Sequence, residues 1–343
     1  MRILFLVKSN NESYGICKGL QNSALFLSNA LNLMGFFAEV STVIDANGID
    51  KEVDRFKPDL VVIEAYWVTP QKLKELLVIY KHKLPKTHWV VRSHSKITFC
   101  SEEGQIMEWS YGYKTLSDRY NFKLSGNHQN FVEDIDTILD YKIDYLPNIY
   151  QPGYSIYNNH IHHHETINIG CFGAIRPLKN QLLSSVAAIR FANEINHTLN
   201  FHINTGRIET RGEQVLKNLR ALFYNHAKHS LVEHGWLSHK DFLSLVSKMD
   251  LSMQVSYTES FNIVTADAVQ CRVPVVVSDE IEWINKRFKA SCGSIDDMVK
   301  KMHKAYNYPD WAASINTKSL DCYNKNATNV WFNYLTKLGL SQD

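Results

Sequence analysis

Residues 256–278 read SYTESFNIVTADAVQCRVPVVVS, and the organisation of the chain can be worked out from them. Their centre predicts a helix of about two to three turns. The apolar runs 250–255 and 273–277 on either side predict strands, with Pro274 at the edge of the second. A strand, a helix and a second strand in this order are typical of a parallel sheet. The segment therefore predicts an α/β fold.

Two carboxylates make this segment a candidate ligand site. Glu259 lies in the loop that opens the predicted helix, and Asp267 follows eight residues later. At helical rise and twist this spacing separates them by roughly 12 Å along the axis and about 80° around it, which suits two ends of one extended ligand. The amides of Ser260, Phe261 and Asn262 open the predicted helix, where free N–H groups favour an anion such as a diphosphate. An amphipathic helix with two solvated acids is the alternative.

This Glu-x7-Asp pattern resembles the Glu-x7-Glu signature of family 4 retaining glycosyltransferases, whose GT-B fold has two Rossmann-like domains facing across a cleft. The resemblance implies that Glu259 contacts the donor sugar and that Asp267 holds the ribose hydroxyls, while the backbone between them approaches the sugar and phosphate. Three positions depart from the signature. Asp267 is shorter than Glu by one methylene, and Asn262 and Arg272 stand where the family usually has glycine. These departures leave the expected fold unchanged but bear on the choice of donor.

A second motif follows the apolar run 167–172, which predicts a strand. Residues 173–180 read GAIRPLKN and resemble the Gly-Arg-x-x-x-Lys-Asn segment of the same family. The resemblance implies that Gly173 lets the backbone approach the diphosphate and that Arg176 and Lys179 neutralise it. When a glycosyl bond breaks, negative charge builds on the departing phosphate, and GT-B enzymes generally place cations and helix amides there instead of a metal. A solvated basic turn is the alternative.

The start of the chain predicts another strand–helix–strand unit. Residues 2–7 and 37–43 predict strands, and a polar loop bearing Gly19 leads into the helix between them. The family opens with two glycines before its first helix, and here Lys18 replaces one and Gly19 remains. Such a loop can bind a ligand at the carboxyl edge of the sheet, and a tight turn without a ligand is the alternative. No GxGxxG occurs, so a dinucleotide is disfavoured and no cofactor is expected beyond the nucleotide sugar as co-substrate.

Two further sites take their roles from the resemblance. Residues 89–94 predict a strand that ends in His94, and the family places a histidine near the end of the corresponding strand to reach the donor sugar. A hydrogen-bonded histidine without that role is the alternative. Gly235, Trp236 and Leu237 match the glycine turn beside which the family binds the nucleotide base. The expected catalytic residues are therefore Glu259, Arg176, Lys179 and His94. Residues 235–237 are the candidate contacts to the nucleotide base.

The length and composition of the chain favour two folded domains. It has 343 residues, of which 45% are hydrophobic and 21% charged. Residues 1–150 are expected to form an acceptor-binding Rossmann-like domain, and residues 151–324 a nucleotide-sugar-binding one. The C-terminal helix, about residues 325–343, is expected to pack back on the first domain, as it does in GT-B proteins.

Several features bear on metals and location. Residues 150–166 predict a polar linker, and their histidine cluster, His160 and 162–164, lacks other residues with ligand geometry, so we expect a hinge loop and no metal. The six cysteines are scattered without a CxxC pair, which is typical of a reduced, cytoplasmic protein. No run approaches 18 apolar residues, so no transmembrane segment is expected.

The acceptor is a separate hypothesis. The residues around Glu259 and the segment 278–283 look like variants encoded by tailed bacteriophages, some of which glycosylate hydroxymethylated bases of their own DNA. Duplex DNA as acceptor requires a basic surface and extrusion of the base. Candidates for that surface are Lys81, Lys83, Lys86, Lys114, Arg119 and Lys123.

Against this DNA hypothesis, residues 1–168 hold 17 basic and 19 acidic side chains. A saccharide or small molecule is the alternative acceptor. An inactive GT-B protein that binds a nucleotide sugar is the alternative function. A phosphorylase-type enzyme requires a pyridoxal lysine site, which we do not find in the sequence.

Overall fold

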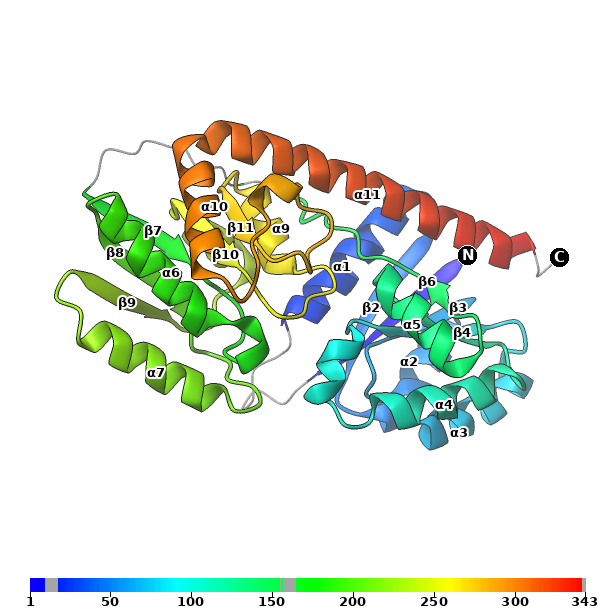
Figure 1. The fold of residues 1–343 in the computed structure, drawn as a ribbon. Coiled ribbons are helices and arrows are strands. Elements are labelled where there is room, and N and C mark those ends of the chain that lie inside the picture. Colours follow the sequence, from blue (N-terminus) through cyan, green and yellow to red (C-terminus); the bar gives the residue numbers. More distant parts are fainter. Residues whose placement is uncertain (10–17, 155, 157–164, 341–343) are drawn as a thin grey trace. The chain divides into compact units, whose positions relative to one another are not determined.

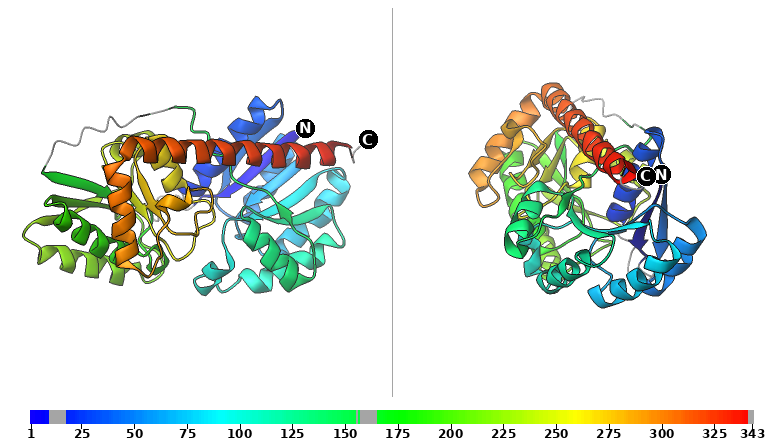
Figure 2. Two further views of the ribbon diagram at one scale, coloured as in Figure 1. Left: turned by 45° about the horizontal axis from the view of Figure 1, so that its top comes forward. Right: turned by 90° about the vertical axis from the view of Figure 1, so that its right-hand side faces the viewer.

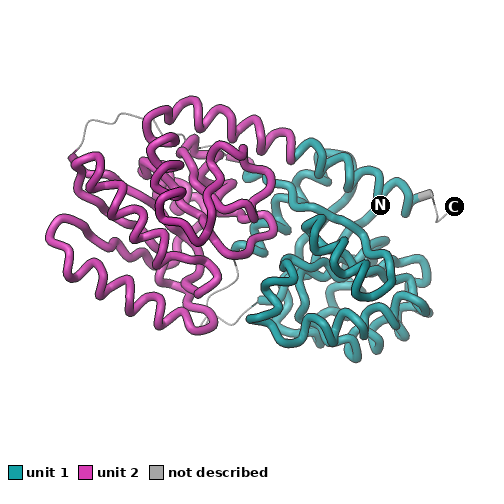
Figure 3. The backbone as a smooth tube through the Cα atoms, in the orientation of Figure 1, with its two compact units in different colours: residues 1–152, 324–343 teal, residues 153–323 magenta. Residues whose placement is uncertain are grey.

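The computed structural model describes residues 1–9, 18–154, 156 and 165–340 (Figure 1). The chain divides into two compact units, coloured separately in Figure 3. Unit 1 comprises Met1–Pro152 and Asn324–Asp343, and unit 2 comprises Gly153–Tyr323. Most of the first polar loop and the histidine cluster of the expected linker lie outside the described residues.

Unit 1 is built on a parallel sheet of six strands in the order β2-β1-β3-β4-β5-β6. Its strands are β1 (Arg2–Lys8), β2 (Phe37–Val43), β3 (Leu60–Glu64), β4 (His88–Ser93), β5 (Phe122–Gly126) and β6 (Asp144–Tyr145). The helices that connect them are α1 (Lys18–Leu33), α2 (Ile49–Phe56), α3 (Pro70–Lys83), α4 (Ile106–Ser117) and α5 (Gln129–Leu139).

The strands of unit 1 are buried on both faces, because alternate side chains of a strand point to opposite sides. In β1, Leu4 and Leu6 belong to the core shared with helices α2 to α5. Phe5 between them packs against Trp331 of the C-terminal helix, with ring centroids 6.1 Å apart. Continuous apolar runs, rather than alternating ones, follow from this burial, and they are the signal that predicted these strands.

Unit 2 is built on a second parallel sheet, of five strands in the order β11-β10-β7-β8-β9. Its strands are β7 (Thr166–Gly170), β8 (Thr198–Asn204), β9 (His229–His234), β10 (Leu251–Gln254) and β11 (Val275–Val277). Its helices are α6 (Gln181–Glu194), α7 (Gly212–Tyr224), α8 (His239–Val246), α9 (Ile263–Gln270) and α10 (Ile295–Asn307).

The order of strands reverses in the middle of this second sheet. Strand β7 pairs with β8 on one side and with β10 on the other. Ligands of open parallel sheets bind outside the carboxyl ends of the strands at such a reversal. The loops that follow β7 and β10 carry residues 173–180 and 256–262, so the two motifs of the sequence flank this position.

Helix α11 (Pro309–Leu340) is the long helix of Figure 2, and its residues pass from unit 2 to unit 1 at Asn324. In unit 1, Asn324 exchanges two hydrogen bonds with the backbone of Tyr150, at 2.9 and 3.0 Å. The buried indole of Trp331 donates to the Pro147 carbonyl at 2.8 Å. Among the described helices, α11 included, none combines the length and the apolar character needed to span a membrane.

Candidate functional site

The helix between the two carboxylates begins later than the sequence suggested. Helix α9 starts at Ile263, and Asn262 is its N-cap, with the side-chain oxygen accepting from the Thr265 amide at 2.8 Å. Glu259 therefore lies in the preceding loop, and the separation expected from helical rise does not apply. The amides of Ser260 and Phe261 also precede the helix, so the amides of its first turn begin at Ile263.

Two departures from the family signature occupy left-handed backbone positions. Asn262 has φ +59° and Arg272 has φ +60°, a region that glycine enters without strain. Helix α9 ends at Gln270 in a Schellman arrangement with Arg272 as its left-handed residue, since the Val273 amide donates to the Ala268 carbonyl at 2.9 Å and the Arg272 amide to the Val269 carbonyl at 3.0 Å. Asn262 and Arg272 thus adopt the left-handed conformation for which glycine is usually preferred.

Lys179 and Glu259 form a nearly buried ion pair. Their charged atoms are 2.5 Å apart, and their side chains are 12% and 8% exposed. Burial alone would raise the pKa of Glu259, but the charges of Lys179 and Arg176 outweigh it and hold the pKa below its ordinary value. The loops after β7 and β10, about eighty residues apart in sequence, thereby meet through opposite charges.

Gly173 opens the first of these loops with φ +112°, which glycine alone adopts readily. A Cβ atom at this position would lie 4.0 Å from the Lys179 ammonium. The Gly173 amide donates to the side chain of Asn204, at the end of β8, at 3.0 Å. Because Gly173 has no side chain, no Cβ atom lies between its backbone and the Lys179 ammonium.

Arg176 is held by an acid that the sequence did not single out. Its Nη1 donates to Glu209 at 3.0 Å, and the other oxygen of the same carboxylate pairs with Arg207. No motif marked Glu209 or Arg207, because both belong to the irregular segment after β8. They meet Arg176 only because β7 and β8 are neighbours in the sheet.

Asp267 is also paired with a residue that sequence reasoning missed. His239, the first residue of α8, lies with Nε2 2.8 Å from the buried Asp267 carboxylate. Its Nδ1 lies 2.5 Å from the Tyr154 hydroxyl. His239 is visible in the sequence, four residues after Gly235. Its contact with Asp267 could not be predicted, because residue spacing does not show that α8 and α9 are neighbours.

The Gly235–Leu237 turn is fixed against the end of β8. A Cβ atom on Gly206 would lie 2.9 Å from the Trp236 amide nitrogen, so the two backbones are in close approach. The indole Nε1 of Trp236 is buried and finds no hydrogen-bond acceptor among the described residues. This turn therefore offers an indole donor next to the strand-end loops.

A buried amide network supports the start of α9. Gln254, at the carboxyl end of β10, donates to the Phe172 carbonyl at 2.8 Å and accepts from Asn262 at 3.0 Å. One side chain therefore ties the loop after β7 to the N-cap of α9. Sequence reasoning missed Gln254 because it lies within the predicted strand 250–255 and belongs to no motif.

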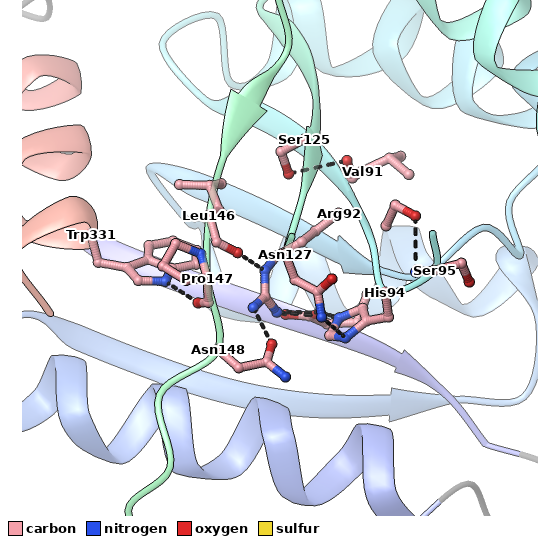
Figure 4. A network of polar contacts seen from close by, with 12 residues as sticks. Val91, Arg92, His94, Ser95, Ser125, Asn127, Leu146, Pro147, Asn148 and Trp331 are labelled. Carbon is pink, nitrogen blue, oxygen red and sulfur yellow. Dashed lines mark hydrogen bonds and ion pairs between the residues drawn. The ribbon is translucent and has the colours of Figure 1, made fainter. Parts of the chain in front are cut away.

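Unit 1 has its own polar cluster where β3 and β4 end (Figure 4). Glu64 and Arg92 are fully buried and face each other across paired strands, with both carboxylate oxygens within 3.1 Å of one guanidinium nitrogen. Arg92 also donates to the Leu146 carbonyl at 2.7 Å and to the Asn148 side chain at 2.5 Å. The buried charges are thus paired and hydrogen-bonded.

His94 follows β4, as the sequence predicted, and joins this cluster. Its Nε2 contacts Glu64, and its Nδ1 lies 3.3 Å from the Asn127 amide nitrogen. The same Nε2 lies 3.2 Å from a guanidinium nitrogen of Arg92. Burial lowers the pKa of His94, Glu64 acts in the opposite direction, and Arg92 lowers it further. Both ring nitrogens of His94 therefore have partners within unit 1.

Two other predicted features of unit 1 lie in unexpected places. Gly19 is the second residue of α1 rather than part of a loop. The basic segments considered for DNA lie at the amino ends of β4 and β5, opposite the edge that carries His94, where Lys81 and Arg119 line a cavity of about 380 Å³. Lys83 is already paired with Asp54 at 2.8 Å. The basic residues thus do not gather at the ligand-binding edge of this sheet.

Potential metal ligands are not clustered in the described part of the chain. Within residues 1–9, 18–154, 156 and 165–340, no three or more His, Cys, Asp or Glu side chains come together as a metal site. The histidines at 160 and 162–164 fall outside these residues.

Comparison with known proteins gives a fold. No family model and no curated protein sequence matches the chain. A sucrose-phosphate synthase from Thermosynechococcus elongatus is similar over 100% of both chains, with a TM-score of 0.68 at 13% identity. The catalytic domain of starch synthase IV from Arabidopsis thaliana, bound to ADP and acarbose, has a TM-score of 0.69 at 9% identity, covering 99% of each chain.

A third solved structure, the HepE protein of Anabaena in complex with UDP-glucose, has a TM-score of 0.62 at 13% identity. It covers 97% of this chain and 100% of that one. These full-length similarities confirm the predicted α/β GT-B fold, with two Rossmann-like domains that each contain a parallel sheet.

Proposed function

We propose that this protein is a retaining glycosyltransferase. In this proposal unit 2 binds a nucleotide-sugar donor and unit 1 binds the acceptor. The fold is shared with structures described as sucrose-phosphate and starch synthases and with the HepE structure, which holds UDP-glucose. The proposal for this chain rests on the side chains at the strand ends of unit 2.

The observation that carries the proposal is the meeting of both motifs at the strand reversal of unit 2. Gly173, Lys179 and Arg176 come from the loop after β7, and Glu259 from the loop after β10. A glycine backbone, two cations and the first turn of α9 supply what a diphosphate requires. A carboxylate beside them can bind the sugar hydroxyls.

The roles follow from the charge that develops during transfer. The bond from the anomeric carbon to the phosphate breaks, a bond from that carbon to the acceptor oxygen forms on the same face, and the proton of the acceptor hydroxyl passes to the departing phosphate oxygen. Arg176 and Lys179 are proposed to stabilise the negative charge on the departing phosphate without a metal. Glu259 and His94 are proposed to contact the transferred sugar.

The remaining donor contacts are assigned by position. Asp267 is proposed to bind the ribose hydroxyls beside His239, and the Gly235–Leu237 turn to contact the base. The backbone of Ser260, Phe261 and Asn262 is proposed to lie along the sugar and phosphate. Gly19 is proposed to contribute from the start of α1.

A donor screen tests the proposal. Thermal-shift measurements with UDP, ADP and GDP sugars should reveal a stabilising donor, and its hydrolysis or transfer should proceed in EDTA. The product of transfer should keep the anomeric configuration of the donor, as read by NMR coupling constants. Inversion of configuration would contradict the retaining mechanism. Binding of a nucleotide sugar without hydrolysis or transfer would favour the inactive alternative.

Hydroxymethylated duplex DNA is the acceptor that the sequence suggested, and it remains a prediction without support from the comparisons. The basic residues that would hold DNA lie at the amino edge of the unit 1 sheet, and Lys83 is engaged by Asp54. A filter-binding titration at two salt concentrations tests it, because each phosphate contact adds about 0.9 to the slope of log affinity against log salt. Absence of salt-dependent binding would leave a saccharide or small molecule as the acceptor.

A further inference from the structure

The segment after β8 is held in a conformation that its residues do not favour. Thr210 has φ +36°, which is uncommon for a residue with a branched Cβ. A Cβ atom on Gly212 would lie 2.1 Å from the Ile175 carbonyl oxygen, so no other residue fits there without a shift of the backbone. Strain of this kind persists where the surrounding structure imposes it, and it gathers at functional sites.

Backbone hydrogen bonds impose this conformation. The Ile175 amide donates to the Arg207 carbonyl at 3.0 Å, and the Glu209 amide donates to the Ile175 carbonyl at 2.9 Å. Ile175 and Ile208 form a parallel bridge. The segment is therefore joined to the loop that carries Arg176, one residue beyond Ile175.

The result is a carboxylate between two guanidinium groups. Glu209 accepts from Arg176 at 3.0 Å through one oxygen and pairs with Arg207 through the other. Side-chain exposures of 16%, 20% and 26% for Arg176, Glu209 and Arg207 show a cluster that is shielded but reachable from solvent.

Counting charges gives Arg207 a specific role. Lys179 and Glu259 neutralise each other, and Glu209 neutralises one arginine. The five side chains therefore carry a net charge of +1, and this charge depends on Arg207. Without Arg207, the cluster proposed to attract a diphosphate would be neutral.

We propose that Arg207 is a further anion-binding residue of the donor site and that Glu209 is the positioning residue that orients Arg176. This inference rests on the proposed function. Glu209 fixes the guanidinium of Arg176 in advance, which lowers the conformational cost of binding. Arg207 restores the positive charge that Glu209 removes.

The two roles predict effects of opposite sign on binding. Arg207→Gln should weaken the affinity for inorganic pyrophosphate and for UDP or ADP about tenfold, the size of one unit charge acting over roughly 10 Å at an effective dielectric constant of about 20. Glu209→Gln should bind pyrophosphate at least as tightly as the native protein, since the net charge rises. Its turnover should nevertheless fall, because Arg176 is no longer oriented.

The double variant provides the rescue. Arg207→Gln combined with Glu209→Gln returns the cluster to a net charge of +1, which Arg176 then carries. Its pyrophosphate affinity should return to within about threefold of the native value, while its turnover stays low. Arg220→Gln and Glu233→Gln, in an exposed pair of the same unit at 2.7 Å, are matched controls that should change neither affinity nor turnover.

Calorimetric titrations with pyrophosphate, UDP and ADP decide between the outcomes. Equal affinity of the native protein and Arg207→Gln would overturn this inference while leaving the proposed function in place. Weaker binding by Glu209→Gln would also overturn it, and this variant serves if Arg207→Gln does not fold. No binding of any of these anions by the native protein would overturn the proposed function and this inference together.

Discussion

In unit 1 the Glu64–Arg92 ion pair at the strand ends is fully buried and bonded within the unit, whereas the cations Lys179 and Arg176 of unit 2 remain partly exposed. Glu64 and Arg92 have no exposed side-chain surface. In unit 2, Lys179 and Arg176 keep 12% and 16% of theirs. Both clusters lie at the carboxyl ends of parallel strands, so their positions in the fold are alike. The difference in exposure bears on ligand binding, because only a partly exposed cation can exchange its internal acid for a ligand.

The largest expected effect breaks the buried pair of unit 1. Glu64→Gln leaves the Arg92 charge without a counter-charge and should lower the free energy of unfolding of unit 1 by about 3–5 kcal/mol. Glu259→Gln in unit 2 should cost less, about 1–3 kcal/mol, because the Lys179 ammonium can reach water. Urea unfolding followed by hydrogen exchange in each unit measures both.

The matched control for this comparison is Glu233→Gln, whose partner Arg220 is exposed, and it should change stability by less than about 0.5 kcal/mol. If Glu64→Gln and Glu259→Gln lower the free energy of unfolding equally, the proposed distinction between the two clusters is wrong.

The second effect concerns turnover rather than folding. Arg176→Ala or Lys179→Ala should reduce turnover about ten- to a thousandfold, because each removes a charge proposed to face the leaving phosphate. Single-turnover rates with the donor found by screening provide the measurement, with Arg220→Ala as the control. Near-native turnover in both variants would show that the cations of unit 2 are not catalytic.

The third prediction uses pH to distinguish the units. Burial and the neighbouring His234 lower the pKa of His202 from 6.5 to about 4. The unfolded chain therefore binds this proton more readily, so the stability of unit 2 falls as pH drops below about 6.5 and the loss is complete below about 4. At pH 5 it amounts to about 2 kcal/mol. In unit 1, the pKa of His128 is lowered to about 3, so its loss extends to lower pH.

Unfolding of His202→Gln between pH 7 and pH 4 tests this assignment. The variant should show a smaller acid loss in unit 2 and an unchanged one in unit 1, whereas His128→Gln should do the reverse. An unchanged pH profile in both variants would contradict the linkage.

The fourth prediction separates the two carboxylates of the unit 2 site. Asp267→Ala should weaken the binding of a free nucleoside diphosphate about tenfold, a typical effect of losing a charged hydrogen bond. Glu259→Gln should spare this binding and mainly reduce transfer. Calorimetry with UDP and ADP measures it, and the reverse pattern would mean that the donor lies the other way round.

The smallest effect concerns the left-handed helix ends of both units. Arg272→Gly should be more stable than Arg272→Ala by about 1 kcal/mol, because alanine is strained at φ +60°. Asp140, the C-cap of α5 at φ +46°, offers the same pair of substitutions in unit 1. Thermal unfolding of the four variants provides the values, and a more stable alanine at position 272 would contradict the conformational argument.

Much of the fold could be predicted because its signals are local. The apolar runs of β1, β2, β4 and β10 and the helix between residues 256 and 278 were located to within a few residues. The segment 98–140 carries no clear motif in the sequence, yet it forms α4, β5 and α5. Its aromatic and acidic residues mask the apolar periodicity, since Tyr113 and Phe131 are core residues while Tyr111 and Asn130 are exposed.

The candidate site could be predicted only in part. Glu259, Asp267, Arg176 and Lys179 were marked by motifs, but the motifs were silent about their partners. Glu209 lies 33 residues beyond Arg176, and His239 lies 28 residues before Asp267. Such pairs arise from the order of strands and helices in space, which residue spacing does not contain.

The sequence by itself determined the strand–helix units and the charges at the ends of two strands, because hydrophobic periodicity, glycines and charged motifs act over a few residues. Only the tertiary structure decided what those charges meet. The reversal of strand order between β7 and β10 brought Lys179 to Glu259, and the pairing of β7 with β8 brought Arg176 to Glu209. Burial and charge pairing depend on atoms distant in sequence, so these properties emerge only when the sheet is assembled.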